Sequence, residues 1–234
     1  MQENKRILEV DALRGLAIVL MIIYHFIFDL NYFGLANFDM SNPLMIIFQR
    51  VIAVLFVGLV GVSLVLSENK NKNGYLKHMW RGFKLTNFAI LITAVTWIYP
   101  HKGFISFGII HMIALSTFIA PLFFRFKKWN LLIGIVLIVV GIWFNLHQTD
   151  SRSLFWLGLI YPEYEALDFY PILPWFGVVL TGMAICELIY KNKRFEFKNT
   201  WANRLAILGR HSLAIYLTHQ IILVGIIMAY IISR

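Results

Sequence analysis

The amino-acid sequence predicts an all-α integral membrane protein, a bundle of about seven transmembrane helices. Of its 234 residues, 59% are hydrophobic and only 14% are charged, whereas about a quarter of the residues in a soluble domain are charged. The apolar residues gather into seven segments of roughly the 20 residues that a helix needs to cross a bilayer. No linker, low-complexity tract or internal repeat divides the sequence, so we expect one domain over residues 1–234.

The prediction of a membrane-spanning helix is stronger for some of the seven segments than for others. The first lacks a small-residue cleavage site and contains His25 and Asp29, so we expect a retained helix, not a signal peptide. The third is short, and the tight connection at 100–103 favours a hairpin of tilted helices over 84–124. The stretch 148–169 is long enough for a short amphipathic element. The predicted segments are 13–33, 44–67, 84–100, 104–124, 129–147, 170–190 and 210–232.

The basic residues predict the orientation, because Lys and Arg are enriched in short cytoplasmic loops. With a cytoplasmic N-terminus, 17 of the 21 basic residues lie on the inner side, three lie outside, and Arg50 lies within the second segment. We therefore expect a multi-pass protein of the plasma membrane, and the net charge of +9 does not indicate nucleic acid. The basic residues of the inner face either only determine the orientation of the protein in the membrane or also attract an anionic cytoplasmic ligand. The inner set is Lys5, Arg6, Arg14, Lys70, Lys72, Lys77, Arg81, Lys84, Arg125, Lys127, Lys128, Lys191, Lys193, Arg194, Lys198, Arg204 and Arg210.

The first segment carries the main candidate site. Its stretch RGLAIVLMIIYH places Arg14 and His25 eleven residues apart, which is about three helical turns, so both project from nearly one face about 16 Å apart. Asp29 follows one turn later, where a carboxylate can orient an imidazole and raise its basicity. Ionisable residues within membrane segments are functional candidates by default. The alternatives are that Arg14 only anchors the helix at the inner boundary and that Asp29 pairs structurally with Arg50.

Two further histidines lie at a similar depth. His219 stands nine residues past Arg210 and is followed by Gln220, so it lies about 14 Å from the inner end of its segment. This pair either belongs to the site or hydrogen-bonds helices together, and for His111 we favour the second role. The spacing fits a ligand with an anionic head at the inner surface and a thin arm that reaches mid-membrane. Coenzyme A and a lipid pyrophosphate both have that shape.

Four stretches of the sequence resemble a known family. EVDALRGLAIVLMIIYHFIFDL, with an Arg, ten residues and then a His, resembles the opening of the transmembrane acyltransferase superfamily. FVGLVGVSLVLS, FYPILPWFGVVLTGM and LGRHSLAIYLTHQ look like the heparan-alpha-glucosaminide N-acetyltransferase catalytic-domain family in its short prokaryotic form. The resemblance implies a cytoplasmic acetyl-CoA donor, an acceptor on the far side of the membrane, and a possible homodimer. The sequence is much shorter than the eponymous eukaryotic enzyme, so we expect an acceptor other than heparan sulfate.

The resemblance implies the roles of His25 and Arg14, and the roles of the other residues below are our hypothesis from their type and position. His25 is then the catalytic histidine, oriented by Asp29, and it either acts as general base on an amine or hydroxyl of a sugar or amino sugar or takes up the acyl group itself. We expect membrane lipid as a further partner, and no nucleic acid or metal. The residues expected to bind coenzyme A are Arg14, Arg81, Lys84, Arg210, Ser212, His219 and Gln220. Those expected to bind the acceptor are Trp175, Tyr170 and Arg50.

Two functions of other classes stay open. Buried His, Asp and Arg side chains also form the proton relays of transporters and channels, although the internal repeats that many transporters show are not evident in this sequence. The other is a non-catalytic lipid-binding or assembly protein. Binding of coenzyme A separates the first alternative from an acyltransferase, because a transporter has no reason to bind it.

Overall fold

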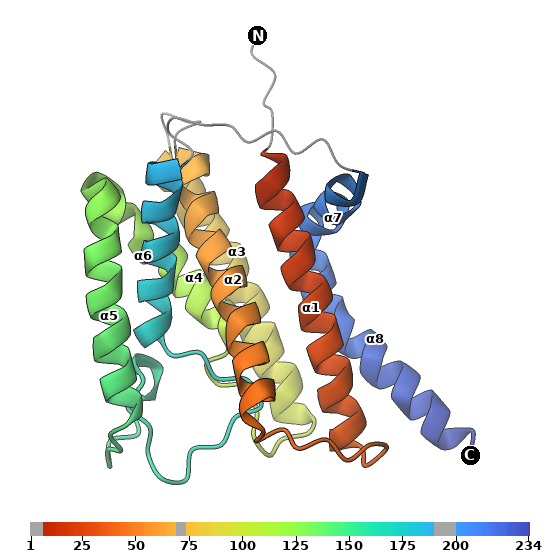
Figure 1. The fold of residues 1–234 in the computed structure, drawn as a ribbon. Helices are drawn as coiled ribbons and strands as arrows, with labels where there is room; N and C mark the ends of the chain where they lie inside the picture. The colour runs from red at the N-terminus through yellow and green to blue at the C-terminus, as the bar shows by residue number, and fades with distance from the viewer. Residues whose placement is uncertain (1–6, 69–73, 190–199) are drawn as a thin grey trace. The chain divides into compact units, whose positions relative to one another are not determined.

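The computed structural model describes residues 7–68, 74–189 and 200–234 (Figure 1). In these residues the chain forms eight α-helices and two 3-10 helices, with only isolated β-bridges. The prediction of an all-α chain is confirmed. The helices are α1 (Leu8–Tyr32), α2 (Pro43–Glu68), α3 (Gly74–Ile98), α4 (Ile109–Ile119), η1 (Ala120–Trp129), α5 (Asn130–Asn145), η2 (Phe155–Leu157), α6 (Ile172–Ile189), α7 (Thr200–Arg210) and α8 (Ser212–Ile232).

Five helical stretches in the described residues are long and apolar enough to cross a membrane. At 1.5 Å per residue, even an 18-residue helix is about 27 Å long, close to the thickness of the hydrocarbon core. Helix α3 has 25 residues, but Lys77, Arg81 and Lys84 make its first half polar. The number of seven spans stays a prediction. The five stretches are Leu8–Tyr32, Pro43–Glu68, Ile109–Asn145, Ile172–Ile189 and Ser212–Ile232.

Three element boundaries differ from the predicted ones. Helix α3 begins at Gly74, ten residues before the predicted segment, because its exposed Lys and Arg are good helix formers. The fourth segment begins at Ile109 and continues through η1, and the helical path breaks at Lys127, whose φ is 47°. Residues 148–169 hold only a 3-10 turn, Phe155–Leu157, in place of an amphipathic helix.

Part of the predicted inner set lies outside the described residues, as does Tyr190, the last residue of the predicted sixth segment. These basic residues are Lys5, Arg6, Lys70, Lys72, Lys191, Lys193, Arg194 and Lys198.

The chain divides into two compact units, which are described one at a time. Unit 1 comprises residues 1–59 and 194–234, and unit 2 comprises residues 60–193. The expectation of a single domain stays a prediction. Unit 1 holds α1, the first part of α2, α7 and α8. Unit 2 holds the remaining helices.

Unit 1 depends on a close contact between α1 and α7. A Cβ atom at Gly15 would collide with the backbone carbonyl of Leu205, and one at Gly209 would collide with the carbonyl of Asp11. Small residues let two helix backbones approach this closely. Because α7 residue numbers rise as the contacting α1 numbers fall, the two helices are antiparallel. The turn at His211 reverses the chain into α8, which packs along α1.

Unit 2 is built on two tightly packed helix pairs. Helices α3 and α4 pack against each other, as the hairpin prediction requires, and α5 packs against α6. Nε2 of His111 on α4 lies 3.1 Å from Oγ1 of Thr93 on α3. The backbone N–H of Gly108 donates to Nδ1 of His111 at 3.2 Å. The prediction that His111 links two helices is confirmed.

The long connection of unit 2 is tied to the start of α4. The N–H of Ile109 donates to Asp168 Oδ2 at 2.9 Å, and the N–H of Tyr170 donates to the carbonyl of Phe107 at 3.0 Å. The Asp168 carboxyl packs against Gly108, so it is desolvated although the residue as a whole is only partly buried. Burial raises the pKa of Asp168 to about 6, opposed by the hydrogen bond from Ile109.

Replacing Gly209 tests the α1–α7 contact. Gly209→Ala should destabilise the protein by about 1–3 kcal/mol, because the new methyl group forces two backbones apart. The matched control is Gly225→Ala in α8, where a Cβ meets nothing within 4 Å and the better helix former should be neutral or stabilising. The measurement is thermal unfolding in detergent. Equal melting temperatures for the two variants would contradict the packing described here.

Asp168 should make stability depend on pH. Its pKa when folded is raised above the unfolded value, so folded protein binds the proton more tightly and loses stability as pH rises from about 4 to 6. Asp168→Asn keeps an acceptor for the Ile109 N–H and cannot titrate. We expect melting temperatures measured between pH 4 and 7 to show this loss in the wild type and not in the variant. Parallel pH profiles for the two proteins would refute the assignment.

Candidate functional site

Helix α1 carries polar side chains at three levels toward α7 and α8. It is continuous from Leu8 to Tyr32, so Arg14 and His25 stand about 16 Å apart along its axis. That placement agrees with the predicted geometry. The first level contains Asp11, Arg14 and Arg210, and the second contains His25 and His219. The third contains Asp29 and Gln220.

The first level is one buried carboxylate between two arginines. Asp11 is 4% exposed, and Arg14 donates from its guanidinium to Asp11 Oδ1 at 2.7 Å. Arg210 Nε lies 3.7 Å from Asp11 Oδ2. The side chains of Arg14 and Arg210 are 25% and 44% exposed. Sequence reasoning missed Asp11, although its position three residues before Arg14 is the spacing of a helical ion pair.

The second level is a pair of histidines. The rings of His25 and His219 meet edge to face, with centroids 4.9 Å apart. His219 Nδ1 lies 2.6 Å from the carbonyl oxygen of Tyr216, and since a carbonyl only accepts, Nδ1 carries the hydrogen. The neutral ring therefore leaves Nε2 unprotonated, and this atom is buried without a hydrogen-bond partner. Such a nitrogen can take a proton or accept a hydrogen bond from a ligand.

The third level corrects the expected role of Asp29. The predicted partner of this carboxylate is His25, but Gln220 Nε2 donates to Asp29 Oδ1 at 2.7 Å. The described residues contain no hydrogen bond between Asp29 and His25. The short Asp29 side chain reaches the amide donor of α8, while the His25 ring contacts His219. Asp29 Oδ2 and Gln220 Oε1 are buried without partners.

Four further predicted site residues lie on α2, α3 and α8. Arg81 and Lys84 are exposed on α3 in unit 2, and Arg50 is exposed on α2. Ser212 is the first residue of α8, two positions after Arg210.

The expectation that Tyr170 and Trp175 line the acceptor site stays a prediction, and in the structure both side chains are buried. Their exposed fractions are 8% and 4%, and their ring centroids lie 4.8 Å apart. Large aromatic side chains contribute most by burial when they lie in a core. Both residues serve packing around the start of α6.

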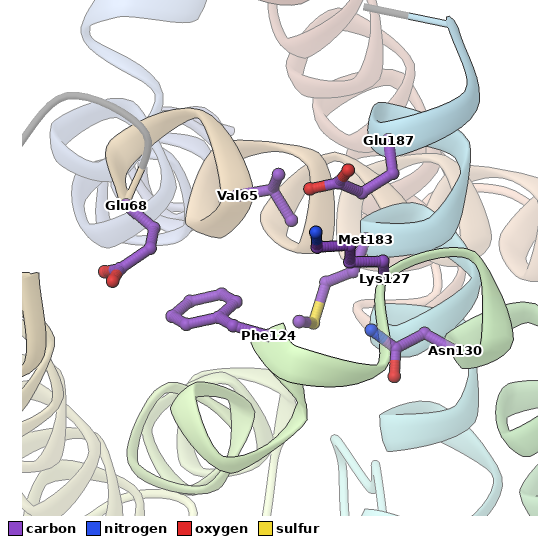
Figure 2. A pocket seen from close by; sticks show the side chains of 7 residues that line it. All are labelled: Val65, Glu68, Phe124, Lys127, Asn130, Met183 and Glu187. Carbon is purple, nitrogen blue, oxygen red and sulfur yellow. The ribbon is translucent and has the colours of Figure 1, made fainter. Parts of the chain in front are cut away.

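A separate cavity of about 140 Å³ lies in unit 2 (Figure 2). Asn130 is 1% exposed, and its amide donates to the carbonyl of Phe123 at 3.0 Å. Both acidic and basic side chains line the cavity, and none of the predicted site residues is among its lining residues. In the part of the chain that the structure describes, no group of three His, Cys, Asp or Glu side chains gathers that could hold a metal ion. The cavity is lined by Val65, Glu68, Phe124, Lys127, Asn130, Met183 and Glu187.

Five bilayer-length apolar helical stretches, with ionisable side chains buried among the helices of unit 1, are typical of a polytopic membrane protein. Comparison with known families narrows this class. The family described as heparan-alpha-glucosaminide N-acetyltransferase, catalytic, matches residues 6–221, and the chain belongs to this family of transmembrane acetyltransferases. The resemblance read from the four sequence stretches is confirmed. No curated protein and no solved structure gave a match. The matched range contains all three levels of polar residues on α1, α7 and α8.

Removing the amide of Gln220 tests the third level. Gln220→Leu should cost about 1–3 kcal/mol or more, because a buried carboxyl loses its hydrogen-bond donor. The double variant Gln220→Leu with Asp29→Leu should recover much of that loss, because both polar groups are then gone. Thermal unfolding in detergent of the two single variants and the double variant forms a double-mutant cycle.

The control for this cycle is Thr218→Val on the same helix. Thr218 is exposed and its hydroxyl donates to the carbonyl of Ala214 one turn earlier, so its replacement should be nearly neutral. If Gln220→Leu is as mild as Thr218→Val, the hydrogen bond to Asp29 does not stabilise the fold.

Proposed function

We propose that the protein transfers an acetyl group from cytoplasmic acetyl-CoA to an acceptor on the opposite side of the membrane. The family match supports acetyl transfer. The observation that carries the proposal is the pairing of His25 with His219 on the same helix face as Arg14. A base in the middle of the membrane and a cationic group near one end are the two features that this reaction requires. The orientation with a cytoplasmic N-terminus is part of the proposal.

Arg14 and Arg210 are the proposed contacts for the coenzyme A phosphates. Guanidinium groups bind phosphate oxygens through paired, charge-assisted hydrogen bonds, and both side chains retain exposed surface. Ser212 lies in the first turn of α8, where the positive end of the helix dipole favours an anion. From this end the pantetheine arm would extend about 16 Å along α1 to His25. Arg81 and Lys84 stay predicted phosphate contacts.

The histidine pair supplies the proposed proton transfer. In the proposed step, an unprotonated ring nitrogen of His25 takes a proton from the acceptor amine or hydroxyl as that group attacks the thioester carbonyl. The tetrahedral intermediate collapses, the carbon–sulfur bond breaks, and the thiolate of coenzyme A takes the proton back. In the alternative route His25 attacks first and carries the acetyl group to the acceptor. Incubation with acetyl-CoA alone, followed by mass spectrometry, distinguishes the routes, because only the second leaves an acetylated protein.

Unpaired hydrogen-bond acceptors at the second and third levels favour an acceptor molecule that carries several hydrogen-bond donors, as a sugar or amino sugar does. Asp29 Oδ2, Gln220 Oε1 and His219 Nε2 are all buried without hydrogen-bond donors. Leaving buried acceptors unpaired is costly, so a ligand with several N–H donors would be stabilised there. The carboxylate of Asp29 can bind an acceptor amine in its protonated form, which must lose that proton before the neutral amine attacks the thioester carbonyl. An amino sugar offers both the donors and such an amine.

The first experiment is calorimetric binding of acetyl-CoA to the protein purified in detergent, followed by transfer of radiolabelled acetyl groups to glucosamine. We expect binding that Arg14→Ala weakens. A folded sample that binds no acetyl-CoA would refute the proposal and favour a proton-coupled transporter, for which His25, His219 and Asp29 would form the relay.

Replacing His25 tests the proposed base. His25→Ala should lower turnover by about 100-fold or more, the usual contribution of general base catalysis, while the affinity for acetyl-CoA stays within about twofold of the wild type, because the phosphate contacts are untouched. The matched control is His147→Ala, which removes an exposed histidine at the end of α5. Normal turnover in the His25 variant would exclude this residue as the base.

A further inference from the structure

We propose that Asp11 is a positioning residue that holds Arg14 and Arg210 together as one binding site for the phosphates of the acyl donor. This inference rests on the proposed function, and it adds a residue that touches neither the acetyl group nor its acceptor. Asp11 acts through the two arginines.

The geometry places a single carboxylate where two distant parts of the chain meet. Arg14 follows Asp11 by one helical turn, and its guanidinium donates to Oδ1 at 2.7 Å. Arg210 is the last residue of α7, and its Nε stands 3.7 Å from Oδ2. Each oxygen of Asp11 therefore faces a different arginine. A single carboxylate thus pairs with an arginine of its own helix and with an arginine of α7.

The backbone fixes this meeting point. Gly209, next to Arg210, lies against the carbonyl oxygen of Asp11 itself, with no space for a Cβ between them. The distance between the Cα atoms of Asp11 and Arg210 is thus set by this backbone contact. A loop could place Arg210 in many ways, whereas this helix contact allows one. A site on rigid elements holds its ligand more accurately than a site on loops.

The charges explain why a carboxylate is needed there. Two guanidinium groups drawn to one place repel each other, and the buried carboxylate between them offsets this repulsion. Each guanidinium has five N–H donors, while a carboxylate has only two acceptor oxygens, so Asp11 orients the pair without saturating it. Asp11 is 4% exposed, which keeps its charge away from an anionic ligand. The cluster keeps a net charge of +1 with its cationic groups toward the surface.

The test compares Asp11→Asn with the wild type in binding and in turnover. We expect the Kd for coenzyme A and the KM for acetyl-CoA to rise about tenfold, equivalent to about 1.4 kcal/mol, with kcat within about twofold. Asp11→Glu keeps the charge and should recover at least half of the lost affinity on a logarithmic scale. A Kd that is unchanged or lower in Asp11→Asn would overturn the proposal, since Asp11 would then only reduce the positive charge.

The matched control is Glu9→Gln. Glu9 is 9% exposed and precedes Asp11 by two residues on α1, and among the described residues it forms no ion pair. The Glu9→Gln substitution removes one negative charge close to Asp11 without altering a contact to either arginine. The affinity for coenzyme A should therefore stay within about twofold of the wild type. An equal loss of affinity in both variants would also overturn the proposal, because the effect would be one of total charge.

Two outcomes separate this inference from the proposed function. If the folded wild type binds no coenzyme A, the proposed function fails, and the inference fails with it. If the wild type and Glu9→Gln bind while Asp11→Asn binds equally well, only the role of Asp11 is refuted. Should Asp11→Asn not fold, the comparison of Asp11→Glu with the wild type decides: a Kd raised more than about threefold, which is half of the expected tenfold loss on a logarithmic scale, or one that falls, contradicts a positioning role.

Discussion

The arrangement of unit 1 depends on the contact of two helix backbones without side chains between them. Gly15 and Gly209 place α7 directly on α1, and this contact sets the starting point and direction of α8. The ion pairs at Asp11 lie at one edge of the contact. The His25–His219 pair and the Asp29–Gln220 hydrogen bond lie farther along the same two helices. Polar groups buried at these depths are tolerated because each level has a partner on the neighbouring helix, and the partners are aligned only if the backbones remain in register.

The apolar helices could be predicted from the sequence because their signal is local. For α1, α2, α5, α6 and α8 the predicted and observed ends agree within about five residues, since continuous apolar runs leave few alternatives. Helix α7 was missed because Asn203, Arg204 and Arg210 interrupt its apolar residues. Its packing depends on Gly209 and on a carbonyl about 200 residues earlier in the chain. A contact between distant residues leaves no periodic pattern in one sequence.

The same distinction applies to the site. His25, His219 and Gln220 are polar residues within apolar runs, so the local sequence alone identifies them as candidate site residues. The partner of Asp29 did not follow from local reading, because spacing on one helix favours His25 while the fold supplies the amide of Gln220. The burial of Trp175 also could not be predicted locally: an aromatic residue near a helix start suggests a binding surface, and the fold leaves it 4% exposed.

The hydrogen bond between Asp29 and Gln220 joins residues that are synthesised far apart in time. Helix α1 leaves the ribosome before α8, with a carboxylate whose donor is 191 positions downstream. Until α8 is inserted into the bilayer, α1 has to be retained by its apolar residues alone, and Asp29 adds a cost to that intermediate. Insertion of α8 removes this cost and supplies the missing hydrogen-bond donor in the same step. Premature chain termination before α8 would therefore leave an exposed acidic side chain in the membrane, a feature by which quality control can distinguish an unfinished chain from a complete one.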